Sequence, residues 1–395
     1  MNRVKILHCA DLHLGKVHAG QHTCGDALDA LRRICSLCRE ENIDFLLIAG
    51  DLFERNDIPG TLFGEVSNLL GMIAPTQVLI VAGNHDYLSP NGCYSTGRLP
   101  DNVFVFGEQL TCQVFEQQKV RVWGQSFASP HVTVSPEAIT PPEKESDWIA
   151  LGILHGEVCA SGRSMYRPIA REWISKSGLH YLALGHQHGR TALLKEGQTI
   201  YAYSGCPQGQ GFDEGGTCGV YMGTIDNAGT HLSFVPTSAY KWHVLSLSVP
   251  SGLPARERTS YQGRLDRLLL EKFGENYKKN QYKILLQGEQ STGEDGWAAE
   301  QWAEVIRTVA PHAVVVDERE IPRDFAALSG EPGLRGVFVK KLWDQVVLLD
   351  RELETLSETD GDAADRERRE ELTRKRRTLC RALELGLAAF DGGEA

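Results

Sequence analysis

Five short clusters of carboxylate, imidazole and amide side chains mark the first half of this 395-residue chain. In chain order, their residues are Asp11, His13, Asp51, Asn84, His85, Asp86, His155, His186 and His188. Ligands of these types suit divalent ions such as Mn²⁺, Fe²⁺ or Zn²⁺ and require no thiolate. Two such ions about 3.5–4 Å apart activate a water and screen a phosphate during in-line attack. The residue types therefore indicate a two-metal site for phosphoester chemistry, with Asp51 as the obvious bridging carboxylate.

Each cluster follows an apolar run that is typical of a β-strand, and the runs cover residues 4–7, 45–49, 78–81, 149–154 and 181–184. In layered α/β folds, ligand sites collect at the carboxyl ends of the strands. Side chains from five such ends can therefore converge although they are far apart in sequence. Glycines beside the clusters, such as Gly50 and Gly185, permit sharp turns there. A lone D-x-H or H-x-H is more often structural, but five clusters in this order favour a metal site.

Taken in order, D-x-H, G-D, G-N-H-D, H and G-H-x-H resemble the calcineurin-like metallophosphoesterase superfamily. The resemblance implies an α/β (α+β) fold, a four-layered β-sandwich flanked by helices. It also implies two ligand sets that share Asp51: Asp11, His13, Asp51 and His188 for one ion, and Asp51, Asn84, His155 and His186 for the other. His85 would not bind metal but would protonate the leaving oxygen or stabilise its charge, and Asp86 would orient the His85 ring.

The sequence around these motifs is similar to that of the SbcD-type DNA repair exonucleases, in particular of their YhaO-like branch. The similar stretches lie at residues 6–15, 49–53, 83–86, 181–188 and 203–209. They imply a Mn²⁺-dependent DNA nuclease subunit that hydrolyses phosphodiester bonds, as exonuclease or endonuclease, in DNA repair. One position departs from the pattern, because Glu54 stands where several such nucleases have a histidine near the substrate phosphate. Either another group near Arg55 or His85 takes over that role, or the substrate preference differs.

Three parts are expected along the chain: a phosphoesterase domain at residues 1–240, a small α+β capping domain at 241–330 and a helical segment at 331–395. Apolar residues spaced by three and four from Val339 to Leu356, and again from Leu372 to Phe390, predict a helical hairpin interrupted at residues 360–362. By pattern alone, this hairpin packs on its own domain, pairs in a homodimer or docks on another chain. The resemblance favours docking on an SMC-like, SbcC-type coiled-coil ATPase, and related nucleases are typically homodimers.

Composition limits how the chain can contact DNA. Its formal net charge is -11 and its pI about 5.7, whereas proteins that hold DNA by charge alone carry a basic excess. DNA contact would need a local basic patch, bound cations or a partner. The ten cysteines are scattered; Cys35 and Cys38, the one C-x-x-C, fit a buried helix face better than a metal site. Scattered thiols, with no signal region or apolar span, predict a cytoplasmic protein without membrane association.

Two other functions use the same residues. A small-molecule phosphodiesterase or protein phosphatase is favoured by the acidic pI but not by the extension after residue 240. A scaffold with a metal-stabilised fold conflicts with five intact clusters. The remaining histidines, including His8, His18 and His22, lack partnered ligands and are expected to bind no metal. Arg163, Arg167 and Arg171 fit a solvated helix face better than a phosphate-steering series.

Overall fold

The structure is a computed structural model that describes residues 2–16, 24–139, 147–160, 163–290, 297–320, 323–357 and 363–390. The chain divides into two compact units. One comprises Met1–Leu247, Pro254–Leu286 and Ala298–Asp317, and the other Ser248–Leu253, Gln287–Trp297 and Glu318–Ala395. The boundaries expected at residues 240 and 330 stay predictions, since contacts alone do not show which parts fold independently.

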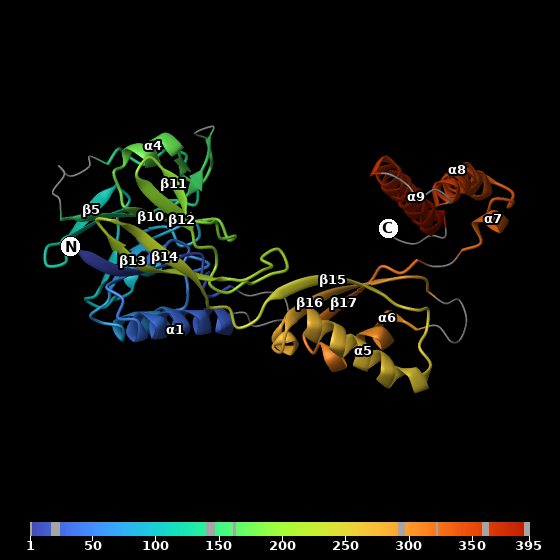
Figure 1. Cartoon of the computed structure of the whole chain (residues 1–395), viewed down its shortest axis with the longest axis horizontal. Helices are drawn as coiled ribbons and strands as arrows, with labels where there is room; N and C mark the ends of the chain where they lie inside the picture. The colour runs from blue at the N-terminus through green and yellow to red at the C-terminus, as the bar shows by residue number, and fades with distance from the viewer. Residues whose placement is uncertain are drawn as a thin grey trace. The chain divides into compact units, whose positions relative to one another are not determined.

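Two six-stranded sheets form the centre of the first unit (Figure 1). The first has the order β14 (Gly229–Pro236), β13 (Gly219–Asp226), β1 (Arg3–Cys9), β2 (Phe45–Ala49), β3 (Gln77–Val81) and β4 (Val103–Val105). The second has the order β11 (Leu194–Glu196), β12 (Thr199–Tyr203), β10 (Tyr181–Gly185), β7 (Ile149–His155), β6 (Val120–Gln125) and β5 (Thr111–Phe115). Strands β1 to β4 run parallel, and so do β6, β7, β10 and β12. The carboxyl ends of neighbouring strands therefore meet at one edge of each sheet.

The two sheets bury a common core between them. Phe45 and Leu47 of the first sheet belong to the same apolar cluster as Val122, Ile153 and Tyr181 of the second, and all five are fully buried. Burying an apolar side chain of this size contributes roughly 1.5–3 kcal/mol relative to exposure. Because alternate residues of β2 also face outward into a helix layer, the whole strand is apolar.

Helices cover the outer faces of both sheets. Helices α1 (Cys24–Glu40) and α2 (Gly60–Gly71) bury Leu31 and Leu70 against the first sheet. Helix α4 (Arg171–Lys176) buries Ile174 against Leu182 of the second sheet. Short elements complete this part: α3 (Cys93–Thr96), β8 (Glu157–Val158) and β9 (Pro168–Ile169). The order helix, sheet, sheet, helix confirms the four-layered fold expected from the sequence.

A smaller α+β section follows in the chain. Strands β15 (Trp242–Ser248), β16 (Gln281–Gln287) and β17 (Ala313–Asp317) form a three-stranded sheet. Helices α5 (Ala255–Phe273) and α6 (Ala299–Val309) and the short turn η1 (Tyr277–Lys279) connect these strands. The apolar face of α6 is buried through Trp302 and Ile306. This section has the α+β composition that the sequence predicts.

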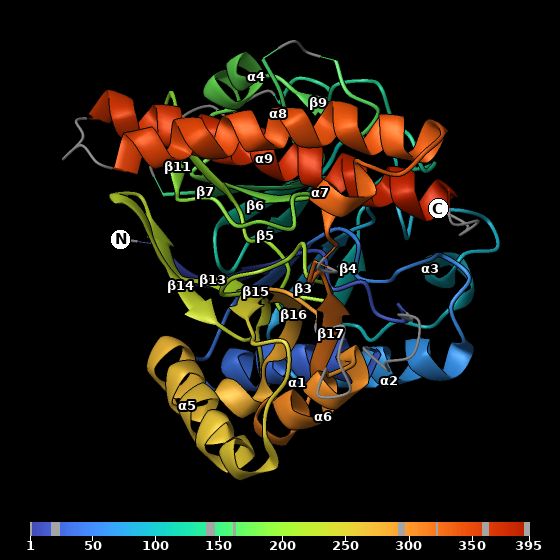
Figure 2. The ribbon, with the colours of Figure 1, turned by 90° about the vertical axis from the view of Figure 1, so that its right-hand side faces the viewer.

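The second unit contains the predicted helical hairpin. Helices α8 (Leu334–Ser357) and α9 (Ala363–Phe390) lie side by side after the short α7 (Phe325–Leu328) (Figure 2). Val339 and Val346 of α8 pack against Leu383 and Leu387 of α9. The interruption expected at residues 360–362 lies outside the described residues. Among the helices that the structure describes, none is both long and apolar enough to cross a membrane.

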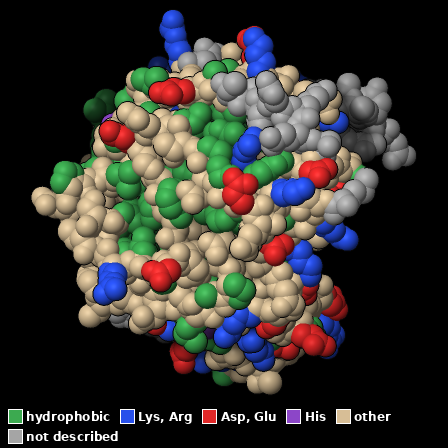
Figure 3. Space-filling model, turned by 90° about the vertical axis from the view of Figure 1, so that its left-hand side faces the viewer, with side chains coloured by type: hydrophobic (Ala, Val, Ile, Leu, Met, Phe, Trp, Pro, Cys, Tyr) green, Lys and Arg blue, Asp and Glu red, His purple; other side chains and the backbone are tan. Residues whose placement is uncertain are grey.

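Charged side chains of both signs are scattered over the face drawn in Figure 3, around a central group of hydrophobic ones. The described side chains on this face form no continuous basic surface. The first sheet ends at β4 and the second at β5, where Phe104 and Val114 are exposed.

Candidate metal centre

The predicted ligands come together at the carboxyl ends of five parallel strands. Asp11 and His13 follow β1, Asp51 follows β2, Asn84 follows β3, His155 ends β7, and His186 and His188 follow β10. Donor atoms of Asp11, His13 and His188 lie within 4.8 Å of one another, as do those of Asp11, Asp51 and His155. Both sheets therefore contribute ligands to one cluster, as the sequence pattern predicts.

The backbone turns sharply where it presents these side chains. Asp11, His13, Asp51 and His186 have φ values of 54°, 48°, 49° and 104°, in the left-handed region. Such conformations cost non-glycine residues of order 1–3 kcal/mol and collect at functional sites. Hydrogen bonds from Asp11 N to Gly50 O and from His13 N to Asp51 O, both 3.0 Å, tie the first two loops together. The backbone of these four residues is thus strained where their side chains point into the cluster.

Glycine beside the ligands leaves room for them. A Cβ atom at Gly50, whose φ is 94°, would collide with the ring of His155. At Gly83 it would collide with the carboxylate of Asp51. Only glycine fits at these two positions, because a ligand side chain lies too close to the backbone for a Cβ atom. This explains why glycines stand next to the ligands in the sequence.

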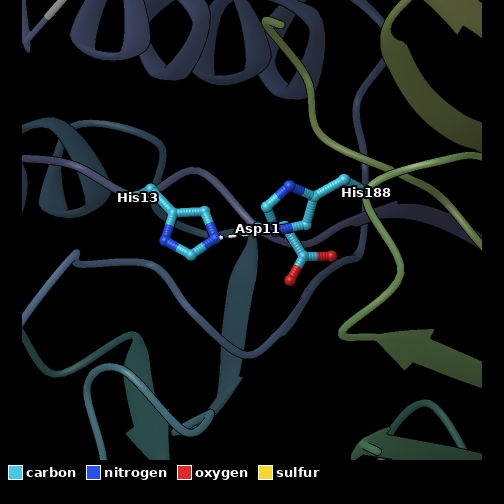
Figure 4. A group of neighbouring side chains, drawn as sticks. All are labelled: Asp11, His13 and His188. Atoms are coloured by element: carbon cyan, nitrogen blue, oxygen red, sulfur yellow. Dashed lines mark hydrogen bonds between the residues drawn. The ribbon is translucent and has the colours of Figure 1, made fainter. Parts of the chain in front are cut away.

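At one end of the cluster, His13 and His188 face each other. Their Nε2 atoms lie 3.1 Å apart, beside the carboxylate of Asp11 (Figure 4). The Nδ1 of His188 donates to Oε1 of Glu214 at 2.6 Å. The Nδ1 of His13 lies 2.9 Å from Oε2 of Glu54, although off the line of a well-formed hydrogen bond. The hydrogen bond to Glu214 favours the proton on Nδ1 of His188, so the lone pair of its Nε2 faces Nε2 of His13. In this position both Nε2 atoms could bind one cation together with the carboxylate of Asp11.

At the other end, His155 and His186 meet Asn84. The Nδ1 of His155 donates to the carbonyl oxygen of Ala49 at 2.9 Å, so its Nε2 is the nitrogen that faces the cluster. That Nε2 lies 3.0 Å from Oδ1 of Asn84 and 3.4 Å from Oδ2 of Asp51. The Nδ1 of His186 lies 3.3 Å from the same oxygen of Asn84. Ring nitrogens, an amide oxygen and a carboxylate oxygen therefore converge on this point, as the ligands of a second ion would.

Asp51 lies between the two ends. Its Oδ2 is 3.8 Å from Nε2 of His13 and 3.4 Å from Nε2 of His155. Its Oδ1 accepts the backbone N–H of His85 at 2.9 Å. One oxygen of Asp51 thus faces a histidine of each predicted ligand set, which is the position that a bridging ligand requires.

Buried charge gives the cluster its electrostatic character. Burial raises the pKa of Asp11, whereas His155 and His13 overcome burial and lower the pKa of Asp51. Burial also acts to lower the pKa of His155, but Asp51 and Asp11 raise it to about 9. The pKa of His186 falls to about 4 because of burial and the neighbouring His155. The buried carboxylates of Asp11 and Asp51 favour positive charge beside them, and together with the imidazoles they form a donor set that fits divalent cations.

His85 lies at the rim of the cluster and is the most exposed ring beside it, with 40% of its side chain accessible. Its Nδ1 lies 3.1 Å from the carbonyl oxygen of Glu54, and its ring centre lies 4.7 Å from that of His13. Ligand atoms of His85, His13 and Asp51 are within 4.8 Å of one another. Distance alone therefore leaves both a ligand role and a proton-transfer role open to His85.

The expected contact between Asp86 and His85 is wrong. Asp86 is fully buried, and its Oδ1 accepts the N–H of Gly83 at 2.7 Å. Its Oδ2 accepts the N–H of Phe53 at 3.2 Å and the hydroxyl of Tyr94 at 2.7 Å. The adjacent side chains diverge, so Asp86 fixes the loops around Asp51 and Asn84, while the backbone of Glu54 orients His85.

Two glutamates complete the site, and the sequence reasoning missed what they contact. Glu214 lies between β12 and β13 with only 7% of its side chain exposed. Its Oε2 accepts the N–H of Gln210 at 2.7 Å; although burial opposes it, the hydrogen bond with His188 lowers the pKa of Glu214 to about 2. Glu54, noted only as a departure, turns inward to His13. Glu214 belongs to no ligand motif, and its one signal is its place in a glycine-rich stretch shortly after residues 203–209.

The structure also shows the surroundings of other residues that the sequence analysis considered outside the ligand set. His8 is buried, with ring nitrogens 2.8 Å from the hydroxyl of Tyr181 and 3.2 Å from the carbonyl oxygen of Leu184, and burial lowers its pKa to about 3. His18 and His22 lie outside the described residues. Arg167 is buried just before β9, so the expected solvated helix face is wrong. Cys35 and Cys38 are buried in α1, as expected.

Comparisons with known proteins agree with this geometry. Residues 4–190 match the family model of the calcineurin-like phosphoesterases. The chain is 26% identical over 259 residues to the metallophosphoesterase YhaO of Bacillus subtilis, covering 62% of each protein. It is 25% identical over 252 residues to the SbcD component of the nuclease SbcCD of Bacillus subtilis, covering 54% of this chain and 64% of SbcD. It is 23% identical over 220 residues to the DNA double-strand break repair protein Mre11 of Saccharolobus solfataricus, covering 52% of this chain and 54% of Mre11. The chain thus spans between about half and two thirds of these relatives.

Proposed function

From the premise that residues 4–190 form a calcineurin-like metallophosphoesterase domain, we propose that this chain is a Mn²⁺-dependent DNA nuclease subunit. It hydrolyses phosphodiester bonds with two metal ions and acts in DNA repair. The observation that carries the metal chemistry is the pair of Nε2 atoms of His13 and His188, 3.1 Å apart with their Nδ1 atoms turned to carboxylates. The proposal that the ester lies in DNA is supported by the similarity to SbcD and to Mre11.

The ligand sets follow the two ends of the cluster. Asp11, His13, Asp51 and His188 would hold one ion, and Asp51, Asn84, His155 and His186 the other. Two bound ions would supply positive charge for the phosphate and lower the pKa of the attacking water. The chain itself fixes the tautomers: Glu214 and the carbonyl of Ala49 hold protons on Nδ1 of His188 and His155. The Nε2 atoms of these rings are thus kept available for metal.

His85 would transfer the proton to the leaving oxygen. Its Nδ1 is directed to the carbonyl of Glu54, which leaves Nε2 for proton exchange. Its exposure lets a phosphodiester reach the ring from solvent. A positioned histidine of this kind contributes about 10²–10⁴-fold to a rate. Because Asp86 faces elsewhere, its part is to fix the shape of the loop that presents His85 and Asn84.

The partners are proposed on the same basis. The hairpin of α8 and α9 would dock on an SMC-like, SbcC-type ATPase, and several of its large apolar side chains, including Leu334, Val337 and Leu348, are exposed. Homodimerisation is proposed from the resemblance alone. With a net charge of -11, the chain would approach DNA through its bound cations and its partner rather than through its overall charge.

Substrate turnover by the purified full-length chain tests the proposal. The protein is stripped with a chelator, reloaded with Mn²⁺, and given labelled duplex DNA, single-stranded DNA, a cyclic nucleotide, a phosphopeptide and an aryl phosphodiester. DNA cleavage that depends on Mn²⁺ supports the proposal. Turnover of cyclic nucleotide or phosphopeptide without DNA cleavage, even with the ATPase present, would favour the second candidate, which the acidic pI supports. If none of these substrates is turned over, the remaining hypothesis is a metal-binding scaffold.

A further inference from the structure

Two cysteines face each other at the base of the loop that carries Glu214. Cys206 follows β12 and Cys218 precedes β13, and their Sγ atoms lie 3.5 Å apart. A disulfide bond requires about 2.05 Å, so an approach of about 1.5 Å would join them. Neither thiol has a part in the proposed hydrolysis.

Both cysteines border a cavity. Cys206 is buried and Cys218 is half-buried, and both line a cavity of about 290 Å³. Glu214 and His188 line the same cavity. A cavity of this volume has room for a molecule as small as hydrogen peroxide beside the two cysteines.

The chain between the two cysteines can adjust to bond formation. Residues 207–217 include Gly209, Gly211, Gly215 and Gly216. Gly216 has a φ of 117°, and an added Cβ there would meet no neighbour within 4 Å. A short loop with this much backbone freedom can absorb the movement that brings the sulfur atoms together.

The same loop is coupled to a predicted metal ligand. The Sγ of Cys206 lies 3.6 Å from Oε2 of Glu214, whose Oε1 accepts from His188 at 2.6 Å. The backbone N–H of Cys206 also donates to the carbonyl oxygen of His188 at 3.1 Å. Joining the cysteines would close the ends of the loop while Gln210 N and His188 remain as partners of Glu214.

We propose that Cys206 and Cys218 form a reversible disulfide, with hydrogen peroxide as the oxidant, that closes the loop carrying Glu214. One sulfur, as thiolate, attacks a peroxide oxygen; the O–O bond breaks, and a sulfenic acid and one water result. The second sulfur then attacks the first, the S–O bond breaks, and the hydroxyl leaves as a second water. Two thiols are oxidised by two electrons, and one peroxide is reduced to two waters. This chemistry does not depend on the proposed nuclease activity.

Mass spectrometry of the full-length protein tests the disulfide. The protein is titrated with peroxide, free thiols are alkylated after unfolding, and the digest is searched for a peptide linking Cys206 to Cys218. The expected product is lighter than the two thiol peptides together by two hydrogens, about 2 Da, and is lost on treatment with a dithiol reductant. Persistence of both thiols in alkylatable form, at a peroxide dose that oxidises the exposed Cys112, would overturn the proposal.

Matched variants and a second readout separate the disulfide from simple packing of two thiols. Cys206→Ser and Cys218→Ser should leave the remaining cysteine as a sulfenic acid that a dimedone probe captures, whereas Cys112→Ser should still form the link. In the wild-type protein and in Cys112→Ser, peroxide should slow hydrogen exchange of the amides at residues 207–217. Neither Cys206→Ser nor Cys218→Ser should show this change. Equal slowing in these two variants would attribute the effect to another site and would also count against the proposal.

Discussion

The two ends of the ligand cluster hold their histidines by different means. At the end with His13 and His188, the Nδ1 atoms face the side-chain carboxylates of Glu54 and Glu214. At the end with His155 and His186, His155 donates to a backbone carbonyl, and the nearby oxygen of Asn84 belongs to a neutral amide. The first end therefore has side-chain carboxylates behind both imidazoles, whereas the second has a backbone carbonyl behind His155.

Side chains support the imidazoles at the first end, whereas the backbone supports His155 at the second. A carboxylate behind an imidazole increases the basicity of the ligand and fixes its tautomer, and the loss of such a partner typically weakens metal binding about 10–100-fold. A backbone carbonyl fixes the tautomer without adding charge, and no substitution of a side chain removes it. The His13 end should therefore respond to mutation of its supporting residues, while the His155 end should depend on the ligands themselves.

The largest effect is expected for Asp51→Asn, because Asp51 faces both ends. Removing its charge should weaken both metal positions together and lower turnover by at least about 10³-fold. Calorimetric titration of the stripped protein with Mn²⁺ would show both binding events weakened. Asp57→Asn is the matched control, since Asp57 is an exposed carboxylate close by in sequence. Retention of one undisturbed binding event would show that Asp51 serves one end only.

A comparable loss of rate without loss of metal is expected for His85→Gln. If His85 transfers a proton and does not bind metal, turnover should fall about 10²–10⁴-fold while Mn²⁺ affinity and stoichiometry stay those of the wild type. An aryl phosphodiester with a good leaving group, which needs little protonation, should be affected less than DNA. Loss of a bound ion in this variant would instead place His85 among the ligands, a role that the distances to His13 and Asp51 permit.

The sequence could predict that the proposed ligands converge, because each one lies at the end of a strand. An apolar run such as residues 45–49 marks a buried strand, and the parallel order of strands brings the residues after it to a shared edge. The four-layered fold was expected from the family resemblance, and the structure confirms it. The position of each residue at a strand end thus predicted where the cluster lies.

The supporting residues could not be predicted in this way. Glu214 reaches His188 from a loop whose path is set by the packing of β12 and β13, and no periodic pattern encodes that path. Asp86 shows the opposite case: its motif suggested a partner next to it in sequence, but Phe53 and Tyr94 compete for its oxygens in space. Partners of a side chain depend on loops brought together from distant segments, and one sequence carries no record of them.

Glu214→Gln should affect one end of the cluster alone. The amide keeps the size of the side chain but loses the charge next to His188, so one of the two Mn²⁺ binding events should weaken about 10–100-fold. The second binding event should be unchanged, because His155 is held by the carbonyl of Ala49. Asp213→Asn, an exposed carboxylate on the same loop, is the matched control. Equal weakening of both events would remove the distinction between the ends.

Glu54→Gln should weaken the same binding event as Glu214→Gln, but by less. The side chain of Glu54 is 24% exposed against 7% for Glu214, and its contact with His13 is poorly aligned. Solvent screens its charge more strongly, so the expected loss of affinity is about tenfold or less. Titration of the double variant with Mn²⁺ tests whether the two glutamates act on one ion. Losses that fall on a single binding event place both carboxylates behind the same metal position, whereas losses divided between the two events would mean that His13 and His188 serve different ions.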